Sequence, residues 1–213
     1  MPTMFLSDGP EAASATILLA HGAGAPMDSP MLTAASQALA ARDFRVVRFE
    51  FGYMKARRTG GSRKPPPKAE LLMDEYREAV EQLGSSGPLI IGGKSMGGRV
   101  ASMVADSLYA EGRIAGLLCL GYPFHPPGKP QSLRIQHLQG LQTPALICQG
   151  SRDVFGTREE VALYPLADGI TLLWLADGDH DLKPRKSISG LSASDHLETV
   201  AATTRAWADR LLA

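Results

Sequence analysis

Residues 88–99 read Pro-Leu-Ile-Ile-Gly-Gly-Lys-Ser-Met-Gly-Gly-Arg, and this stretch decides the fold. An apolar run leads straight into Gly-x-Ser-x-Gly, and a helical pattern follows it. The order strand, sharp turn, helix is the context of a nucleophile elbow, in which a strained turn exposes a serine hydroxyl above a sheet. Gly93 and Gly97 leave room where side chains would collide with the neighbouring strand and helix. Ser95 is therefore a candidate nucleophile.

The same residues allow a second interpretation, because Gly-Lys-Ser also ends a phosphate-binding P-loop. That motif requires a glycine five positions before its second glycine, and Pro88 stands there. A P-loop would also begin after a strand, whereas residues 88–91 have the character of the strand itself. The pattern favours the elbow.

Length and composition predict one soluble globular domain spanning residues 1–213. The chain is 44% hydrophobic, and its 22 basic and 22 acidic residues give a formal net charge of zero. A neutral chain gives no electrostatic argument for a nucleic-acid partner or an acidic membrane surface. The first 15 residues lack a basic, apolar signal-peptide pattern, and no apolar run reaches the length of a membrane helix.

Cys119 and Cys148 lie in apolar runs with strand character. We expect buried, reduced thiols there rather than a disulfide, which predicts a cytoplasmic protein. No pair of histidines accompanies them, so they are not expected to form a zinc site.

Apolar runs with strand character alternate with helical patterns along the chain. The expected strands are residues 16–20, 44–49, 88–91, 114–120, 144–149 and 170–175. The expected helices are residues 31–42, 69–83, 99–110, 158–164 and 194–212, and residues 59–68 are interpreted as a long loop. This alternation predicts an α/β fold of three layers, with a mostly parallel sheet of about six strands and helices on both faces. Sites in such sheets lie at the carboxyl ends of the strands.

Two of the loops that follow strands supply what a serine nucleophile lacks. Serine needs a base within hydrogen-bond reach, and the base needs a carboxylate that orients it. Residues 150–153, Gly-Ser-Arg-Asp, supply Asp153, and residues 176–180, Ala-Asp-Gly-Asp-His, supply His180. The order along the chain is Ser95, Asp153, His180.

The expected first strand ends in His-Gly-Ala-Gly at residues 21–24. A glycine-rich turn at that place can aim backbone N–H groups at a developing oxyanion. We assign one donor to Ala23, with Gly24 as the neighbouring alternative, and the second donor to Met96. His21 is expected to hold the shape of this loop through hydrogen bonds.

Together these motifs resemble the α/β-hydrolase superfamily, in the small capless form similar to dienelactone hydrolases. The His-Gly loop, the elbow, the Gly-x-x-Asp turn and the late Gly-Asp-His carry the resemblance over residues 16–183. More narrowly, residues 92–99 and the Tyr-Pro-Phe-His-Pro-Pro-Gly-Lys of residues 122–129 resemble a bacterial family of predicted hydrolases of this fold. The resemblance implies the α/β-hydrolase fold and implies no substrate.

Lys94 departs from the commonest superfamily pattern, in which an aromatic residue, histidine or glutamate precedes the nucleophile. A lysine there either pairs with a nearby carboxylate, which we favour, or attracts an anionic substrate. The interval between residues 120 and 144 is too short for a cap domain. We therefore expect an open pocket and a small substrate, or a large molecule that presents one reactive group.

The other histidines are rivals of His180 as the base. We interpret His137 and His196 as surface residues. His125 lies in a rigid, proline-rich loop after an expected strand and is a candidate for lining the pocket. The other candidate lining residues are His21, Gly24 and Lys94.

Charged residues crowd two of the loops. The aspartates at 177, 179 and 181 are interpreted as a polar turn around His180 rather than a metal site. Two basic stretches are interpreted as solvated loop charge, with attraction of an anionic substrate as the alternative: Lys55, Arg57, Arg58, Arg63, Lys64 and Lys68, and then Lys183, Arg185 and Lys186. No interleaved aromatic residues support stacking on nucleic-acid bases.

The sequence thus predicts a serine hydrolase that acts on a small carboxylic ester, thioester or lactone. Ser95 attacks, His180 is the base, Asp153 orients it, and the amides of Ala23 and Met96 bind the oxyanion. This chemistry needs no metal and no cofactor, and its partner is a small acyl substrate. The alternative is a non-catalytic protein-interaction subunit on the same fold.

Overall fold

A seven-stranded sheet runs through the centre of the molecule in the computed structural model, which describes residues 3–58, 60 and 65–213. The strand order is β1-β3-β2-β4-β5-β6-β7. The strands are β1 (Phe5–Asp8), β2 (Ala15–Ala20), β3 (Phe44–Phe49), β4 (Leu89–Lys94), β5 (Gly116–Leu120), β6 (Ala145–Gly150) and β7 (Ile170–Leu175). β1 pairs antiparallel with β3, and the other neighbouring strands pair in parallel.

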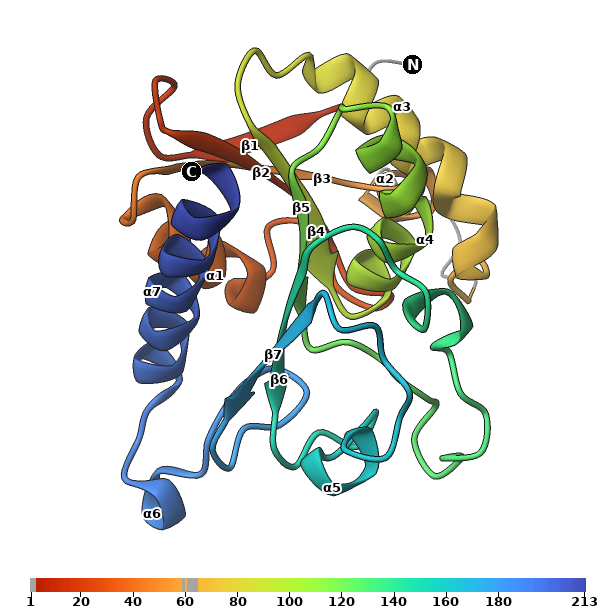
Figure 1. Ribbon diagram of the computed structural model, residues 1–213, viewed down its shortest axis with the longest axis vertical. Helices are drawn as coiled ribbons and strands as arrows, with labels where there is room; N and C mark the ends of the chain where they lie inside the picture. Colours follow the sequence, from red (N-terminus) through yellow and green to blue (C-terminus); the bar gives the residue numbers. More distant parts are fainter. Residues whose placement is uncertain (1–2, 59, 61–64) are drawn as a thin grey trace.

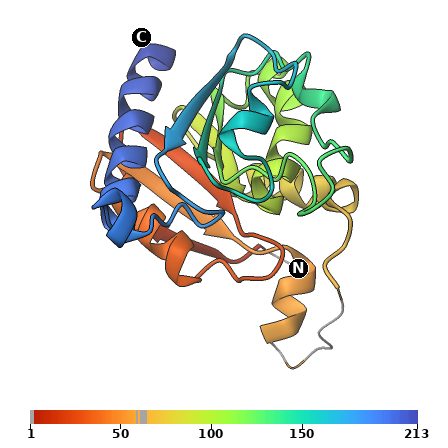
Figure 2. The same ribbon diagram turned by 90° about the horizontal axis from the view of Figure 1, so that it is seen from below.

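Helices cover both faces of this sheet, which gives the three layers that the sequence predicts (Figures 1 and 2). Helices α1 (Pro30–Ala40) and α7 (Ala193–Leu212) lie on one face, and α3 (Met73–Leu83) and α4 (Met96–Ala110) lie on the other. The shorter elements are α2 (Gly52–Arg58), η1 (Ala69–Leu72), η2 (Gln136–Leu138), α5 (Arg158–Val161) and α6 (Lys186–Ser189). The prediction of an α/β fold with a mostly parallel sheet is confirmed.

The central strands are mostly apolar, as expected of strands that are covered on both faces. Every residue of β2, β4, β5 and β6 is buried. Side chains alternate between two apolar cores, one under α3 and α4 and the other under α1 and α7. Residues of β7 are partly buried or exposed, except for Leu175 at its end, because β7 is an edge strand.

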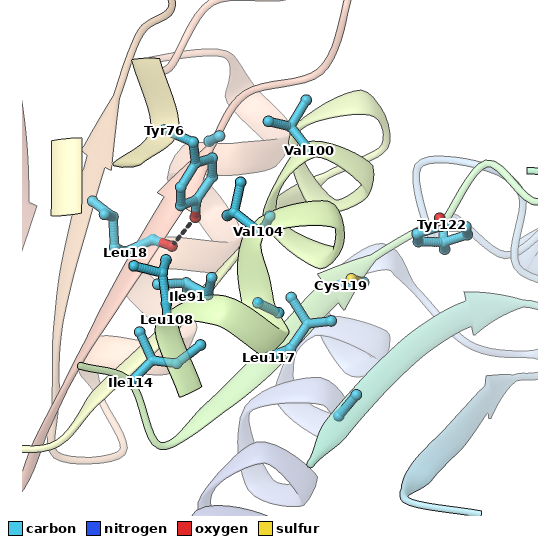
Figure 3. Close-up of a cluster of buried hydrophobic side chains, with 14 of the residues drawn as sticks. Leu18, Tyr76, Ile91, Val100, Val104, Leu108, Ile114, Leu117, Cys119 and Tyr122 are labelled. Atoms are coloured by element: carbon cyan, nitrogen blue, oxygen red, sulfur yellow. Dashed lines mark hydrogen bonds between the residues drawn. The ribbon is translucent and has the colours of Figure 1, made fainter. Parts of the chain in front are cut away.

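Tyr76 ties helix α3 to the two strands that lead to the site (Figure 3). Its side chain is fully buried, and its hydroxyl lies 3.0 Å from the carbonyl oxygen of Leu18 and 2.7 Å from that of Gly92. The hydroxyl also accepts a hydrogen bond of 2.9 Å from the amide of Gly92. These contacts fix the helix over β2 and β4, just before β4 reaches Ser95.

Several sequence expectations differ from the structure. The sheet has seven strands instead of about six, because residues 5–8 form an added edge strand, and α2 and α6 were not predicted. Residues 69–83 form a 3₁₀ turn followed by an α-helix, and the predicted loop at 59–68 includes positions 59 and 61–64, which lie outside the described residues. Cys119 and Cys148 are buried and unpaired, as expected. None of the described helices is long and apolar enough to cross a membrane.

Candidate active site

Ser95 lies in a sharp turn between strand β4 and helix α4. Its backbone has φ 51° and ψ −116°, a strained conformation for a residue with a side chain. A Cβ atom on Gly93 or Gly97 would lie 2.5 or 2.4 Å from the carbonyl oxygen of Ala20, so the turn requires glycine at both positions. Residues 93 and 94 belong to β4 itself, which contradicts the P-loop interpretation.

The structure brings Ser95, His180 and Asp153 together from three different loops. The Ser95 Oγ lies 2.8 Å from Nε2 of His180, and Nδ1 of His180 lies 2.8 Å from Oδ2 of Asp153. Asp153 is fully buried, whereas the His180 side chain is 21% exposed. With Nδ1 protonated, His180 donates to the carboxylate and its Nε2 is free to accept the serine proton.

Gln149 holds the carboxylate of Asp153 from behind. Its Nε2 donates to Oδ2 of Asp153 at 2.9 Å, and its Oε1 accepts from the amide of Tyr122 at 2.7 Å. The amide of Phe155 donates to Oδ1 of Asp153 at 2.9 Å. The sequence analysis missed Gln149, although a polar residue that ends an otherwise apolar strand was a signal for it.

Phe155 contributes a second contact that the sequence analysis missed. Its ring centroid lies 4.1 Å from that of His180, with an angle of 31° between the two planes. The aromatic face limits the positions that the imidazole can adopt. Phe155 comes two residues after Asp153, so the same turn supplies the carboxylate and this contact.

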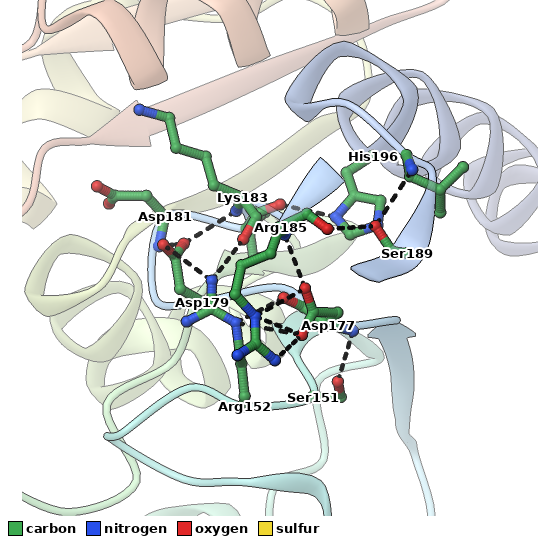
Figure 4. Close-up of polar contacts among 11 residues, drawn as sticks. Ser151, Arg152, Asp177, Asp179, Asp181, Lys183, Arg185, Ser189 and His196 are labelled. Carbon is green, nitrogen blue, oxygen red and sulfur yellow. Dashed lines mark hydrogen bonds and ion pairs between the residues drawn. The ribbon is translucent and has the colours of Figure 1, made fainter. Parts of the chain in front are cut away.

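A polar network fastens the loop of His180 to the loop of Asp153 (Figure 4). The amide of Asp177 donates to Oγ of Ser151 at 2.8 Å, and Nε of Arg152 donates to the carbonyl oxygen of Asp177 at 2.7 Å. The Asp177 carboxylate pairs with Arg185, whose hydrogen bonds lower the pKa of Asp177 to about 2. These contacts hold the loop of His180 in a fixed position beside the loop of Asp153.

His196 supports the same loop from helix α7, and its interpretation as a surface residue is wrong. The side chain is 2% exposed, and its Nδ1 donates to the carbonyl oxygen of Leu182 at 2.7 Å (Figure 4). Leu182 has a positive φ of 62°, so this hydrogen bond holds a strained backbone two residues after His180.

Aromatic residues shape the loop of residues 21–24, to which the sequence analysis assigned an oxyanion donor, from beneath. His21 is fully buried, its Nδ1 donates to the carbonyl oxygen of Gly22 at 2.6 Å, and its Nε2 accepts from the amide of Phe51 at 3.2 Å. Burial lowers the pKa of His21, which keeps the ring neutral as these two bonds require. The hydroxyl of Tyr53 donates to the carbonyl oxygen of Ala23 at 3.0 Å. Two surface hollows adjoin Ser95, and His21 lines neither of them. His21 therefore shapes the loop from below.

Ala23 and Met96 border the space next to Ser95, as the oxyanion assignment requires. Met96 is the first residue of α4, so its amide has no intrahelical acceptor. Gly24, the alternative donor, lines the hollow on the His180 side.

Lys94 points from the elbow toward an aspartate in the His180 loop. Its Nζ lies 3.4 Å from Oδ1 of Asp181, and the lysine side chain is 9% exposed. Burial lowers the pKa of Lys94, while the charge of Asp181 opposes the shift. The structure thus contains the carboxylate pairing that we favoured from the sequence, and Lys94 also lines the hollow beside His180.

Two further histidines differ from their sequence interpretation. His125 is buried away from both hollows, with Nδ1 2.9 Å from the carbonyl oxygen of Pro126 and Nε2 3.3 Å from Glu160, so it does not line the site. His137 is half-buried rather than a surface residue, and its Nε2 lies 2.8 Å from Oγ of Ser102. Burial lowers the pKa of His137 to about 4.

Most of the arginines in the two basic stretches form ion pairs or ring contacts within the protein. Arg58 pairs with Glu50 at 2.7 Å and with Asp28 at 3.0 Å, and Arg185 pairs with Asp177. The guanidinium of Arg57 lies 5.1 Å from the centre of the Tyr53 ring. Arg63 and Lys64 of the first stretch lie outside the described residues.

The aspartates around His180 lie in a hydrogen-bonded turn. Oδ1 of Asp179 accepts hydrogen bonds from the amides of Asp181 and Lys183, which makes this segment a polar turn. Across the described part of the chain, no group of three or more histidine, cysteine or carboxylate side chains is placed to hold a metal ion.

Two hollows meet at Ser95. The first, about 440 Å³, is lined by His180, Lys94 and the loop 22–25. The second, about 1020 Å³, lies on the other side of the serine and is lined by Met96, Arg99 and Arg134. Ala23, Ser95 and Phe155 line both.

A profile of the alpha/beta hydrolase domain matches residues 13–209. The chain belongs to this family. Solved structures with the same fold include the esterase domain of a Rhodothermus marinus protein, at 18% identity and a TM-score of 0.68, covering 99% of each chain. They also include a lidless α/β serine hydrolase from Xanthomonas campestris, at 19% identity and a TM-score of 0.69, covering 97% of this chain and 88% of that one. A dienelactone hydrolase from Anabaena variabilis matches at 19% identity and a TM-score of 0.69, covering 95% of this chain and 89% of that one.

Proposed function

We propose that the protein is a serine hydrolase that cleaves a small carboxylic ester, thioester or lactone through an acyl-enzyme. The observation that carries this proposal is the unbroken chain of two 2.8 Å contacts from Ser95 through His180 to Asp153. The strained backbone of Ser95 adds support, because strain is retained where the surrounding structure enforces it, commonly at functional sites. Membership of the α/β-hydrolase family is consistent with hydrolysis.

Each residue has one task in this mechanism. Ser95 Oγ attacks the substrate carbonyl while Nε2 of His180 takes the serine proton, and Asp153 stabilises the resulting imidazolium. The amides of Ala23 and Met96 bind the negative charge that forms on the carbonyl oxygen. His180 then gives its proton to the leaving oxygen or sulfur, and the acyl group stays on Ser95.

Water completes the reaction from the side that the leaving group has vacated. His180 takes a proton from water, the hydroxide attacks the acyl-enzyme, and Ser95 recovers its proton from His180. In sum, one ester and one water give one carboxylic acid and one alcohol. Esters, thioesters and lactones follow the same steps, and the solved relatives include esterases and a dienelactone hydrolase.

The experiment is a hydrolysis screen of short acyl esters, thioesters and lactones with two single variants, their double variant and one control variant. Ser95→Ala and His180→Ala should each remove most of the activity, and the double variant should lose no more than the single variants, because the triad acts as a unit. Ser102→Ala is the matched control, since Ser102 also forms a 2.8 Å contact with a histidine, His137, but lies buried behind the site.

Two results would contradict the proposal. One is additive loss in the double variant, which would separate the roles of Ser95 and His180. The other is a protein that hydrolyses none of the substrates and does not react with a fluorophosphonate. The second result would favour a non-catalytic protein-interaction subunit. Activity should also survive a metal chelator.

A further inference from the structure

The two hollows beside Ser95 can hold different parts of a substrate. His180 lines the first hollow and not the second. The leaving oxygen must lie within reach of His180, because His180 protonates it. The leaving group of a substrate therefore occupies the first hollow, and the acyl group extends into the second, which we call the acyl cleft.

The acyl cleft combines an apolar wall with a basic end. Pro67, Leu71, Met96 and Pro123 form the wall, and Arg99 and Arg134 lie at the basic end. Leu71 is 72% exposed, so its side chain is accessible to an apolar acyl chain.

The basic end carries positive charge that the described lining residues do not fully neutralise. Lys68, Arg99 and Arg134 contribute three positive charges to the cleft and Glu70 contributes one negative charge, which leaves a surplus of two. Within the described residues, the guanidinium of Arg134 makes no ion pair and no hydrogen bond. Burial and the neighbouring charge of Arg99 lower the pKa of Arg134, so an anion placed between these side chains would be bound favourably.

The single carboxylate in the cleft is weakly held. Glu70 accepts a hydrogen bond of 2.7 Å from Arg99, but its side chain is 51% exposed. Water competes for the Glu70 carboxylate, whereas the Arg99 side chain is only 18% exposed. A substrate carboxylate can therefore replace Glu70 on Arg99 while also binding Arg134.

Arg99 lies at a position along helix α4 that suits a short acyl chain. The amide of Arg99 donates to the carbonyl oxygen of Ser95 at 3.0 Å, so Arg99 stands one helical turn beyond the nucleophile. One turn advances about 5.4 Å along the helix axis. A chain of a few methylene groups spans this separation and places its far end among the guanidinium groups.

We propose that the acyl cleft selects acyl groups that end in a carboxylate, so that the preferred substrates are monoesters of short dicarboxylic acids. This inference rests on the proposed serine-hydrolase function. One monoester and one water give one dicarboxylic acid and one alcohol, and the bond that breaks is the acyl–oxygen bond. A planar guanidinium matches a carboxylate with two parallel hydrogen bonds, which is why arginine suits this role.

The test compares three substrates by pH-stat titration. Monomethyl adipate carries the carboxylate on the acyl side, and the methyl ester of adipic acid monoamide is its neutral isostere. The acetyl ester of ω-hydroxyhexanoic acid carries the carboxylate on the leaving side. The wild-type kcat/KM for monomethyl adipate should exceed that for the neutral amide by roughly tenfold to a hundredfold, the range expected for charge-assisted hydrogen bonds.

Variants separate the cleft from general electrostatics. Arg134→Gln should lower the ratio of kcat/KM for the charged and neutral acyl substrates by about tenfold, and Arg134→Lys should lower it less. Glu70→Gln should raise the ratio, because it removes the competing carboxylate. Arg113→Gln is the matched control: it removes the same charge near the far end of α4, where Arg113 lies 4.0 Å from Glu111, and should leave the ratio unchanged.

The outcomes are distinct from those that test the proposed function. Hydrolysis of the neutral ester with a charged-to-neutral ratio near one would overturn this inference and leave the serine hydrolase intact. A preference for the carboxylate on the leaving side would overturn it as well. A ratio that falls equally in Arg134→Gln and Arg113→Gln would show a long-range charge effect rather than a site. Circular dichroism and the rate of fluorophosphonate labelling identify a variant that has misfolded, and Glu70→Gln then provides the independent test.

Discussion

Replacing Gln149 with leucine tests how the carboxylate of Asp153 is positioned. Gln149 is fully buried and contacts Asp153 at 2.9 Å and the amide of Tyr122 at 2.7 Å. Leucine has a side chain of similar size to that of glutamine, but it is apolar and offers neither the hydrogen-bond donor nor the acceptor. The change therefore removes one bond to a charged group and leaves one buried amide without a partner.

The size of the effect follows from these two contacts. A hydrogen bond to a charged group contributes about 1.5–3 kcal/mol, and an unpaired buried amide costs about 1–3 kcal/mol. The free energy of unfolding should thus fall by about 2.5–6 kcal/mol. If the lost contact also positions Asp153 in the transition state, kcat/KM should fall by roughly tenfold to a hundredfold.

Thr143→Val is the matched control from the opposite end of strand β6. Thr143 is also fully buried, and its hydroxyl donates to Oδ1 of Asp106 at 2.7 Å. Its loss should cost about 1–2 kcal/mol of stability, because the amide of Thr143 still binds Asp106. This variant should keep the wild-type kcat/KM.

Urea unfolding and ester hydrolysis measure the two effects separately. Gln149→Leu should lose both stability and kcat/KM, whereas Thr143→Val should lose stability alone. The reasoning is refuted if Gln149→Leu retains wild-type kcat/KM below the urea transition, since Asp153 would then be positioned without Gln149.

Three further predictions concern the elbow and its support. Burial lowers the pKa of Lys94 below its ordinary 10.5, so at pH values between the folded and unfolded pKa the unfolded chain binds more protons than the folded chain. The free energy of unfolding of the wild type should therefore rise relative to that of Lys94→Met as the pH approaches 10.5. A difference between the two proteins that stays constant with pH in urea unfolding would contradict this. Tyr76→Phe should lower the free energy of unfolding by about 1–3 kcal/mol, because it leaves the buried amide of Gly92 unpaired, and no measurable loss would refute the role of the hydroxyl. Gly97→Ala should reduce kcat/KM and stability, because its Cβ would lie 2.4 Å from the carbonyl oxygen of Ala20; wild-type values would show that the turn tolerates a side chain.

The sequence predicted the parts of the molecule that depend on local pattern and chain order. The strands at 44–49 and 170–175 have the predicted bounds, because each is a run rich in β-branched, aromatic and other apolar residues between clear breaks. Ser95, Asp153 and His180 were placed together because each follows a parallel strand, and the carboxyl ends of parallel strands share one edge of the sheet.

The features that the sequence analysis missed depend on contacts between distant segments. Strand β1 has only four residues and is defined by its pairing with β3, which no local pattern reveals. His196 is buried because the loop at Leu182 folds over it. The basic loops were ambiguous for the same reason, since only the fold shows that Arg58 pairs with Glu50 and that Arg185 pairs with Asp177.

Covalent labelling of Ser95 is the most direct test of the proposed mechanism. A fluorophosphonate loses fluoride to an activated serine and leaves a phosphonyl group on Oγ, which intact-mass measurement and peptide mapping locate. We predict one phosphonyl group per chain on Ser95, no labelling in Ser95→Ala, and much slower labelling in His180→Ala. Labelling at another residue, or ester hydrolysis that persists in Ser95→Ala, would contradict the proposal that Ser95 is the nucleophile.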